Sequence, residues 1–278
     1  MNKKLKTLNI KKKIILQGGK GFKNTKNYDF SIITVCKNSD KSIEKTIRSI
    51  LEQKKVTFEY IIIDGNSSDN TLKKIKKFNR KINYWCSIND NGIYDAMNVG
   101  LKLANAKVIC FVNSDDFFYN TYALSKVKNY FDKRKADYLF GTVKRYYLGN
   151  NMILKSGFNK KRFLYNFDAQ TSHSTGFFIT NKLQKKIGLY NLKFKCSADY
   201  DLFFRIYKSK DLLGLSTTKK EIIGVVNSGG FSSKFGFWNH LLEESKIRFW
   251  NNQNIILILA IFLNAIVKFY LKKFRYKS

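Results

Sequence analysis

The sequence is short of acidic residues, histidine and cysteine, and it contains no proline. The four cysteines lie far apart and show no CxxC or Cys/His ligand spacing. This arrangement indicates buried, reduced thiols rather than disulfides or zinc ligands, and so a reducing compartment. With two histidines, the chain also offers no Ser-His-Asp order and no thiol–imidazole pair for nucleophilic catalysis.

Long apolar runs are scarce as well. Near the amino terminus the apolar run is only Ile14 to Leu16, so we expect no secretory signal and a cytoplasmic protein. Residues 255–271 are interrupted by Asn264 and Lys268 and fall just short of the roughly 20 apolar residues that span a bilayer. Because basic residues follow, we expect a helix lying in an anionic membrane surface; the alternative is packing on the domain or on a partner subunit.

The chain does have a large excess of positive charge. Its 52 Lys and Arg against 20 Asp and Glu leave a formal net charge of +32, which suits nucleic acid, anionic lipid or phosphorylated substrates. The lysines are spread along the whole chain, so the charge does not mark a dedicated nucleic-acid patch. With 44% hydrophobic residues, the 278-residue chain is long enough for one large domain, with or without an appendage.

Strand-like and helix-like patterns alternate after residue 29. Such alternation predicts an α/β fold with a mostly parallel sheet flanked by helices. Ligands of such sheets bind beyond the carboxyl ends of the strands, so the polar residues that follow each apolar run are the candidates for a site. There are four such clusters, and we expect them to line one cleft: Lys37 and Asn38, Asp64 to Asp69, Asp90 to Gly92, and Asn113 to Asp116.

The fourth cluster follows the apolar run "VICFV". In an extended chain Asn113 and Asp115 project to one side and Asp116 to the other. A carboxylate at a strand end is well placed to bind Mg²⁺ or Mn²⁺, which share oxygen ligands with substrate phosphates. The alternative for an Asp-Asp pair is a helix cap or a turn.

The second and third clusters are open to two interpretations. Asp64, directly after a strand, is a candidate to accept hydrogen bonds from a base or ribose, while Asp69 or Asn70 is a candidate cap of the next helix. Asp90 and Gly92 lead into a helix whose amino end suits an anion, and Tyr94 and Asn98 lie on one face of it. Taken singly, these are also ordinary surface residues.

Taken together, "SIITVCKN", "IIIDGNSSDNT", "DNGIYDAMNVG", "NSDD" and "SADYDL" occur in the order found in family 2 glycosyltransferases of the GT-A fold, which the chain resembles closely from Phe30 to about Asn120. The resemblance implies an inverting transferase that moves a sugar from a nucleoside diphosphate donor to an acceptor hydroxyl, with Mn²⁺ or Mg²⁺ as cofactor. It implies metal binding by Asp115, and His173 is a further candidate ligand. Asn113 stands where the family's Asp-X-Asp motif has its first acid. The residues expected to bind the nucleotide sugar are Thr34, Lys37, Asp64, Ser67, Asp69, Asp90, Gly92, Tyr94, Asn98, Asn113 and Asp116.

The same resemblance implies that Asp199 of "SADYDL" is the base that deprotonates the acceptor. In a helix Asp201 points away from Asp199, and we expect it to pair with Arg205, four residues further on. The aromatic neighbours Tyr200, Phe203 and Phe204 are expected to bury Asp199 and tune its pKa.

The predicted organisation has three parts. Residues 1–28 form a basic lead-in, residues 29–233 a GT-A catalytic domain with a nucleotide-binding half (29–120) and an acceptor half (121–233), and residues 234–278 amphipathic helices that can anchor at a membrane. We expect a cytoplasmic protein, peripheral on the membrane, with a lipid-linked or saccharide acceptor for cell-surface polysaccharide or glycolipid and no nucleic-acid partner. The alternatives are a catalytically silent homologue that binds sugar nucleotide or membrane, or a basic nucleic-acid-binding protein.

Overall fold

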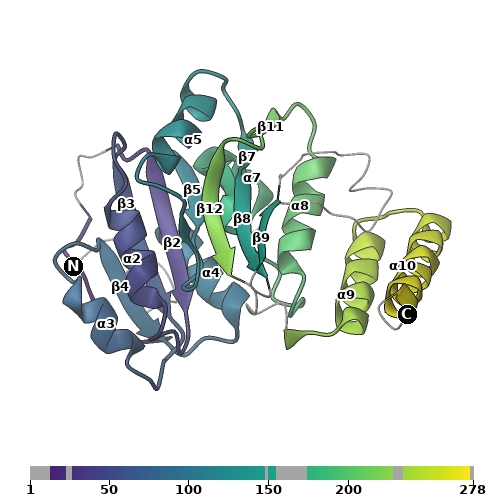
Figure 1. The fold of residues 1–278 in the computed structure, drawn as a ribbon, viewed down its shortest axis with the longest axis horizontal. Helices are drawn as coiled ribbons and strands as arrows, with labels where there is room; N and C mark the ends of the chain where they lie inside the picture. Colours follow the sequence, from purple (N-terminus) through teal and green to yellow (C-terminus); the bar gives the residue numbers. More distant parts are fainter. Residues whose placement is uncertain (1–12, 23–26, 148–149, 155–173, 228–233, 276–278) are drawn as a thin grey trace. The chain divides into compact units, whose positions relative to one another are not determined.

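A computed structural model describes residues 13–22, 27–147, 150–154, 174–227 and 234–275 (Figure 1). The chain divides into two compact units. Unit 1 comprises Met1–Phe158, Thr171–Tyr190 and Leu212–Ser228, and unit 2 comprises Asn159–Gln170, Asn191–Asp211 and Gly229–Ser278. The segment that carries Asp199 therefore belongs to the same unit as the carboxyl-terminal helices.

The central element of unit 1 is an eight-stranded mixed sheet. Its middle strands β4, β3, β2 and β5 are parallel, whereas β1 and β10 pair with antiparallel neighbours. The prediction of an α/β fold with a mostly parallel sheet is therefore confirmed. In spatial order the strands are β1 (Ile14–Gly18), β4 (Tyr84–Ile88), β3 (Phe58–Asp64), β2 (Phe30–Cys36), β5 (Val108–Phe111), β10 (Phe177–Thr180), β7 (Tyr138–Phe140) and β11 (Gly214–Ser216).

Strand β1 lies within the segment that the sequence marks only as a basic lead-in. It forms the edge of the sheet beside β4, and Ile15 and Leu16 remain exposed. An edge strand is held chiefly by backbone hydrogen bonds, so its side chains need no alternating apolar pattern. This explains why the sequence gives little sign of it.

The helices of unit 1 flank this sheet, as Figure 1 shows. All seven residues of β2 are buried, as expected for a strand covered on both faces. Helix α2 buries Ile43, Ile47 and Ile50, which lie on one stripe of the helix. The helices are α2 (Ile43–Leu51), α3 (Thr71–Lys77), α4 (Ile93–Leu103), α5 (Ala123–Asp132) and α7 (Asn181–Ile187).

A second, four-stranded sheet begins immediately after Asp116. Its spatial order is β6 (Phe117–Phe118), β12 (Ile222–Asn227), β8 (Thr142–Tyr147) and β9 (Asn150–Leu154). Gly141 joins β7 to β8, and a Cβ there would lie 2.9 Å from a side-chain carbon of Ile223. The close approach of β12 thus requires glycine at this turn, and it brings Asn227 to the loop that carries Asp115.

Unit 2 contains three described helices, α8 (Ala198–Lys208), α9 (Phe237–Trp250) and α10 (Ile255–Arg275). On α10, Ile258, Ile261 and Ala265 form one buried stripe, while Phe269 stacks on Phe237 of α9 at 4.2 Å between ring centroids. Among the described residues, no helix combines the length and the apolar composition that crossing a membrane requires.

Candidate functional site

The structure brings the four polar clusters to one edge of the large sheet in unit 1. The backbone N–H of Asn38 donates to Ser67 Oγ at 2.8 Å, which joins the ends of β2 and β3. The hydroxyls of Ser39 and Ser114 lie 2.8 Å apart, which joins the end of β2 to the loop after β5. The loops after β3 and β4 meet where Asn66 Nδ2 donates to Asn89 at 3.1 Å. The carboxyl ends of four parallel strands thus form one connected polar surface.

Asp64 is fully buried at this edge and accepts several hydrogen bonds from the protein itself. Its donors include Ser67 Oγ at 2.5 Å, Ser67 N at 3.1 Å and Ser87 Oγ at 2.8 Å. Burial, together with the nearby Asp64 carboxylate, raises the pKa of Cys36 well above its ordinary value, so this thiol stays protonated. In this arrangement Asp64 fixes the loop after β3.

Asp69 caps the start of α3 and holds the end of β2. Its carboxylate accepts from Thr71 N at 2.9 Å and from Asp40 N at 3.1 Å. Burial alone would raise the pKa of Asp69, but these hydrogen bonds lower it overall. Asn70 is the N-cap residue of α3 and makes no side-chain cap hydrogen bond, so the Asp69 carboxylate holds the backbone at the start of this helix.

Asp90 lies over Gly65, where a Cβ would come 2.4 Å from Asp90 Oδ2. Burial raises the pKa of Asp90, while the Gly92 N–H and the charge of Lys37 oppose the rise. Lys37 itself is exposed. Gly92 has φ +116° and precedes α4, a backbone conformation that favours glycine. These three residues lie together at the predicted edge.

Three of the predicted nucleotide-sugar residues have structural contacts instead. Thr34 is buried within β2, 3.1 Å from the hydroxyl of Tyr60. Asn98 is buried and exchanges two 2.9 Å hydrogen bonds with the backbone of Tyr190, and Tyr94 packs against the Tyr190 ring. Helix periodicity correctly placed Tyr94 and Asn98 on one face of α4. That face contacts Tyr190.

Asp115 and Asp116 have opposite environments. Asp115 is half-buried, and its backbone carbonyl accepts from Asn227 Nδ2. Asp116 is completely buried, and its carboxylate accepts from Thr175 Oγ1 at 2.6 Å and from Asn227 N at 3.2 Å. Asp116 N–H donates to the carbonyl of Asn113 at 3.1 Å, and Asn113 Nδ2 donates to the Asp116 carboxylate at 3.3 Å, so residues 113–116 form a turn. The alternation expected from an extended chain is therefore wrong, because Asn113 and Asp116 lie on the same side, and the turn is the alternative that the Asp-Asp pair left open. Asp116 supports the loop from its buried side and is not open to a donor.

Asn113 shares this buried network. Its Nδ2 donates to Ser174 Oγ at 2.8 Å, while its Oδ1 is buried with no hydrogen-bond partner among the described residues. Thr46 of α2 also supports the loop, because its Oγ1 donates to the backbone carbonyl of Asp116 at 2.7 Å. Ser174 and Thr175 directly follow the candidate ligand His173 in the sequence, whereas Thr46 and Asn227 are not among the predicted site residues.

The donor set at this loop fits a divalent metal that is shared with a phosphorylated substrate. Within the part of the chain that the structure describes, no group of three or more His, Cys, Asp or Glu side chains could hold an ion. Mg²⁺ is commonly bound by one or two protein carboxylates together with substrate phosphates, so a full protein cage is not required. The Asp115 carboxylate and the unpartnered Asn113 Oδ1 supply oxygen ligands of this kind. His173 lies outside the described residues.

Asp199 lies in the first turn of α8 in unit 2 and is exposed. Tyr200 and its aromatic neighbours are buried, so the expectation that these rings bury Asp199 is wrong. The reason is its position in the first turn, where no earlier turn of the helix covers it. The prediction for Asp201 is confirmed, because Arg205 Nε donates to its carboxylate at 3.0 Å.

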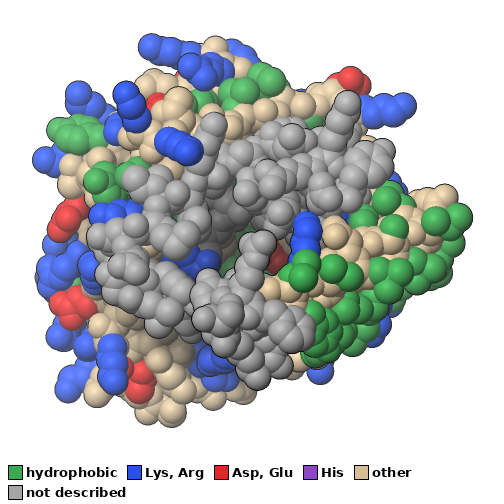
Figure 2. Space-filling view, turned by 45° about the vertical axis from the view of Figure 1, so that its right-hand side comes forward, with side chains coloured by type: hydrophobic (Ala, Val, Ile, Leu, Met, Phe, Trp, Pro, Cys, Tyr) green, Lys and Arg blue, Asp and Glu red, His purple; other side chains and the backbone are tan. Residues whose placement is uncertain are grey.

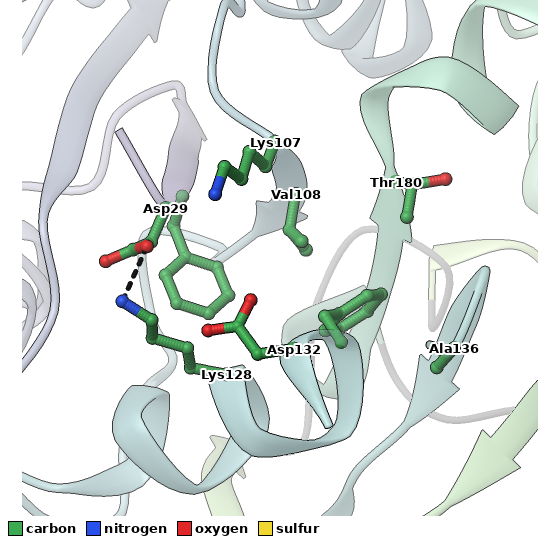
Figure 3. Close-up of a pocket in the computed structure, with 9 residues that line it drawn as sticks. Asp29, Lys107, Val108, Lys128, Asp132, Ala136 and Thr180 are labelled. Atoms are coloured by element: carbon green, nitrogen blue, oxygen red, sulfur yellow. Dashed lines mark ion pairs between the residues drawn. The ribbon is translucent and has the colours of Figure 1, made fainter. Parts of the chain in front are cut away.

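A separate cavity of about 160 Å³ opens at the other end of the parallel strands (Figure 3). It lies where β2 and β5 begin, and Asp29 and Lys128 form an ion pair at 2.7 Å beside it. Lys107, Asp132 and Thr180 also line it. None of the predicted site residues lines this cavity.

The fold and the polar edge define an α/β protein with a nucleotide-binding type of sheet and a candidate metal and phosphate loop after β5. The family described as "Glycosyl transferase family 2" matches residues 31–197. The chain belongs to this family and is a glycosyltransferase.

Relatives and solved structures agree with this assignment. A PGL/p-HBAD biosynthesis glycosyltransferase from Mycobacterium bovis is 29% identical over 188 residues, which cover 66% of this chain and 72% of that protein. The crystal structure of residues 1–349 of Staphylococcus aureus TarS in complex with UDP-GlcNAc superposes with a TM-score of 0.68 at 20% identity, covering 87% of this chain and 73% of that one. A mannosyltransferase from Pyrobaculum calidifontis in complex with GDP-Man and Mn²⁺ gives 0.60 at 11% identity, covering 87% and 69%. These likenesses show the GT-A fold.

Proposed function

We propose that the protein transfers a sugar, with inversion, from a nucleoside diphosphate sugar to an acceptor hydroxyl of a cell-surface polysaccharide or glycolipid. The observation that carries the proposal is the loop after β5, in which Asn113 and Asp116 belong to a buried hydrogen-bond network while Asp115 stays half-buried and Asn113 Oδ1 has no partner among the described residues. Similarity to TarS, whose structure contains UDP-GlcNAc, and to a PGL/p-HBAD biosynthesis glycosyltransferase supports the classes of donor and acceptor.

In this proposal the chain's own residues act mainly by position and charge. Asp115 and Asn113 would hold a Mn²⁺ or Mg²⁺ ion at the diphosphate side of the donor, and that ion would supply positive charge for the departing nucleoside diphosphate. Asp90, Gly92 and Lys37 belong to the same edge and are proposed to bind the donor. Positioning and electrostatics lower most of the barrier, because the donor is already activated.

Asp199 is proposed as the base. It takes the proton of the acceptor hydroxyl as the acceptor oxygen displaces the nucleoside diphosphate at the anomeric carbon, and a single displacement of this kind inverts that carbon. The role of Asp199 rests on the "SADYDL" motif. Asp199 is exposed in the first turn of α8.

A panel of donors tests the function. Release of nucleoside diphosphate from UDP-GlcNAc, GDP-Man and other UDP-, GDP- and dTDP-sugars is measured with Mn²⁺, with Mg²⁺ and with chelator. We expect metal-dependent turnover that Asp115→Ala and Asp199→Asn each reduce by at least about 10²-fold. Asp132→Asn, at the cavity on the opposite edge, is the matched control and should keep full activity. If the natural protein binds a donor but neither it nor any variant turns a donor over, the protein is a silent homologue. If no donor binds at all, the proposed donor site is contradicted.

We also propose that α10 lies on an anionic membrane surface. The side chains of Ile256, Leu259, Leu263 and Val267 are 54% to 73% exposed and recur at intervals of three or four residues, so they form one apolar stripe. Figure 2 shows hydrophobic side chains gathered on the right-hand side, where α10 lies. Lys268 is exposed on the same helix, and further lysines and an arginine follow in the sequence. Apolar and basic residues together are typical of helices that bind anionic lipid.

A further inference from the structure

Helices α8 and α9 of unit 2 lie side by side (Figure 1) and meet through a stripe of polar residues on α9. Residues at intervals of three or four on α9 contact α8 or the segment before it. His240 Nδ1 lies 3.2 Å from Ser197 Oγ, and the Arg248 guanidinium lies 5.6 Å from the centre of the Tyr200 ring. This spacing places the contacting side chains on one face of α9. The face of α9 that contacts α8 is therefore polar. The aromatic residues of "FWNHLLEESKIRFW" give no sign of this polar face in the sequence.

Glu243 makes the most specific contact of this stripe. Its Oε1 accepts from Lys195 N at 2.7 Å, and its Oε2 accepts from Cys196 N at 2.9 Å and from Ser197 N at 3.0 Å. Cys196 Sγ also lies 3.2 Å from Oε2. Three consecutive backbone N–H groups thus point at one carboxylate. Successive amides that converge on an anion hold their own backbone conformation, because a rotation at any of them would break a hydrogen bond.

This carboxylate is ionised at neutral pH. Burial alone would raise the pKa of Glu243, but the N–H donors of Lys195, Cys196 and Ser197 lower it overall. A negative charge at the start of α8 also interacts favourably with the positive end of that helix's dipole. Ser197, the N-cap residue of α8, makes no side-chain cap hydrogen bond of its own. Glu243 therefore fixes where α8 begins.

The segment that Glu243 holds ends two residues before Asp199. Asp199 lies in the first turn of α8, so a change in the backbone at residues 195–197 moves its carboxylate directly. Glu244, beside Glu243, is near enough to Asp199 to respond to its charge. Burial raises the pKa of Glu244 to about 8, and the Asp199 carboxylate adds to the rise while Arg248 opposes it.

We propose that Glu243 is a positioning residue for the transferase reaction, which sets the place of Asp199 by holding residues 195–197. Helix α9 lies beyond residues 31–197, the part that matches the family, and by this contact it belongs to the catalytic apparatus. The inference rests on the proposed role of Asp199 as base.

The test compares both ends of the α8–α9 contact in the full-length protein. Glu243→Gln keeps the size of the side chain but replaces one accepting oxygen with an NH₂ group that faces N–H donors. Lys208→Met is the matched control, because Lys208 Nζ donates to the carbonyl of Asn251 at 2.6 Å at the other end of α8. Turnover and donor binding are measured with the donor of the panel that turns over fastest, and Asp199→Asn is measured alongside.

We expect Glu243→Gln to lower kcat by ten- to a hundredfold, on the order of the loss that a 1 Å misplacement causes. The KM for the donor and the number of donor molecules bound per chain should stay unchanged, whereas general unfolding would lower the number bound. Lys208→Met should keep kcat within about twofold. Unchanged kcat in Glu243→Gln, or an equal loss in both variants, would overturn the positioning role. If Asp199→Asn itself keeps full turnover, the assignment of the base fails, and the inference fails with it.

Hydrogen exchange gives a readout that needs no donor. In Glu243→Gln the backbone amides of residues 195–197 should exchange faster than in the natural protein, while amides near Lys208 should not change. The opposite pattern should appear in Lys208→Met. Unchanged exchange at residues 195–197 in Glu243→Gln would show that Glu243 does not hold this segment, and would overturn the proposal independently of any activity.

Discussion

Asp115 and Asp116 are neighbours in the chain, yet they meet different surroundings. Asp115 is half-exposed at the sheet edge, whereas Asp116 is fully buried and accepts hydrogen bonds from Thr175 and Asn227. A carboxylate that accepts several buried donors stabilises the fold, because each donor would otherwise lose its partner away from water. We therefore propose that this dipeptide separates binding, by Asp115, from stability, by Asp116.

Replacing each of these residues by alanine should show this separation. Asp116→Ala leaves Thr175 Oγ1 and Asn227 N–H without an acceptor, at about 1–3 kcal/mol for each stranded buried donor, so we expect the free energy of unfolding to fall by roughly 3 kcal/mol. Asp115→Ala should change it by less than about 1 kcal/mol but abolish metal-dependent turnover. Chemical denaturation and the donor assay measure both effects. Equal destabilisation by the two variants would contradict the assigned roles.

At the scale of secondary structure, the strong periodic patterns predicted the elements well. The predicted alternation of strands and helices after residue 29 is the order in which β2, α2, β3 and α3 follow one another. The misses share a physical cause, which is that their stability comes from contacts distant in the sequence. Strand β1 is held by backbone pairing with β4. Helix α9 looks amphipathic in sequence, yet it buries Arg248 and exposes Trp250 because its polar face meets α8.

The start of α4 shows how one backbone angle controls an element. Gly92 and Gly236 both precede a helix, and a Cβ on either would meet no atom within 4 Å. They differ in φ, which is +116° at Gly92 and −69° at Gly236. Gly92→Ala should therefore lower the free energy of unfolding by about 1–3 kcal/mol. Gly236→Ala, the matched control, should raise it by about 0.4–1 kcal/mol, because alanine restricts the unfolded chain.

Denaturant titration of the two glycine variants measures these changes. Because neither substitution meets a steric obstacle, the difference between them reports the backbone conformation alone. Equal effects on stability would show that the positive φ at Gly92 is not maintained in solution. Gly92 is also proposed to bind the donor, so donor binding should be weaker in Gly92→Ala than in the natural protein. Donor binding by Gly236→Ala should be unchanged.

At the scale of the whole molecule, the proposed membrane binding would combine the net charge of +32 with the exposed apolar stripe of α10. Charge attracts the protein to an anionic surface over about one Debye length, and apolar side chains provide the binding energy at contact. Salt weakens the attraction between charges and leaves the contribution of the apolar side chains largely intact. Membrane binding by this route should therefore depend on both lipid charge and ionic strength.

Sedimentation with vesicles of phosphatidylglycerol or phosphatidylcholine checks this at the level of the full chain. We expect binding to the anionic vesicles that weakens as salt rises, and little binding to the neutral ones. Leu259→Ser with Leu263→Ser should weaken binding by about tenfold or more, since partial burial of two leucines contributes more than about 1.4 kcal/mol. Leu192→Ser with Leu213→Ser, exposed by 51% and 45%, is the control and should bind normally. Normal binding by the α10 variant would contradict the proposed surface.

The sequence by itself determined the α/β class, the order of the main strands and helices, and the edge at which the polar clusters gather. These features follow from local periodicity and from the rule that parallel strands carry ligands at their carboxyl ends. Only the tertiary structure decided which polar residues at that edge are committed to the protein. In unit 1, Asp116 and Asn98 are bound to Thr175 and Tyr190. Within unit 2, the tertiary structure likewise binds Glu243 to the segment before α8. Such pairings join residues about 50 to 90 positions apart, and no local pattern encodes them, because they depend on how the whole chain brings distant backbone groups together.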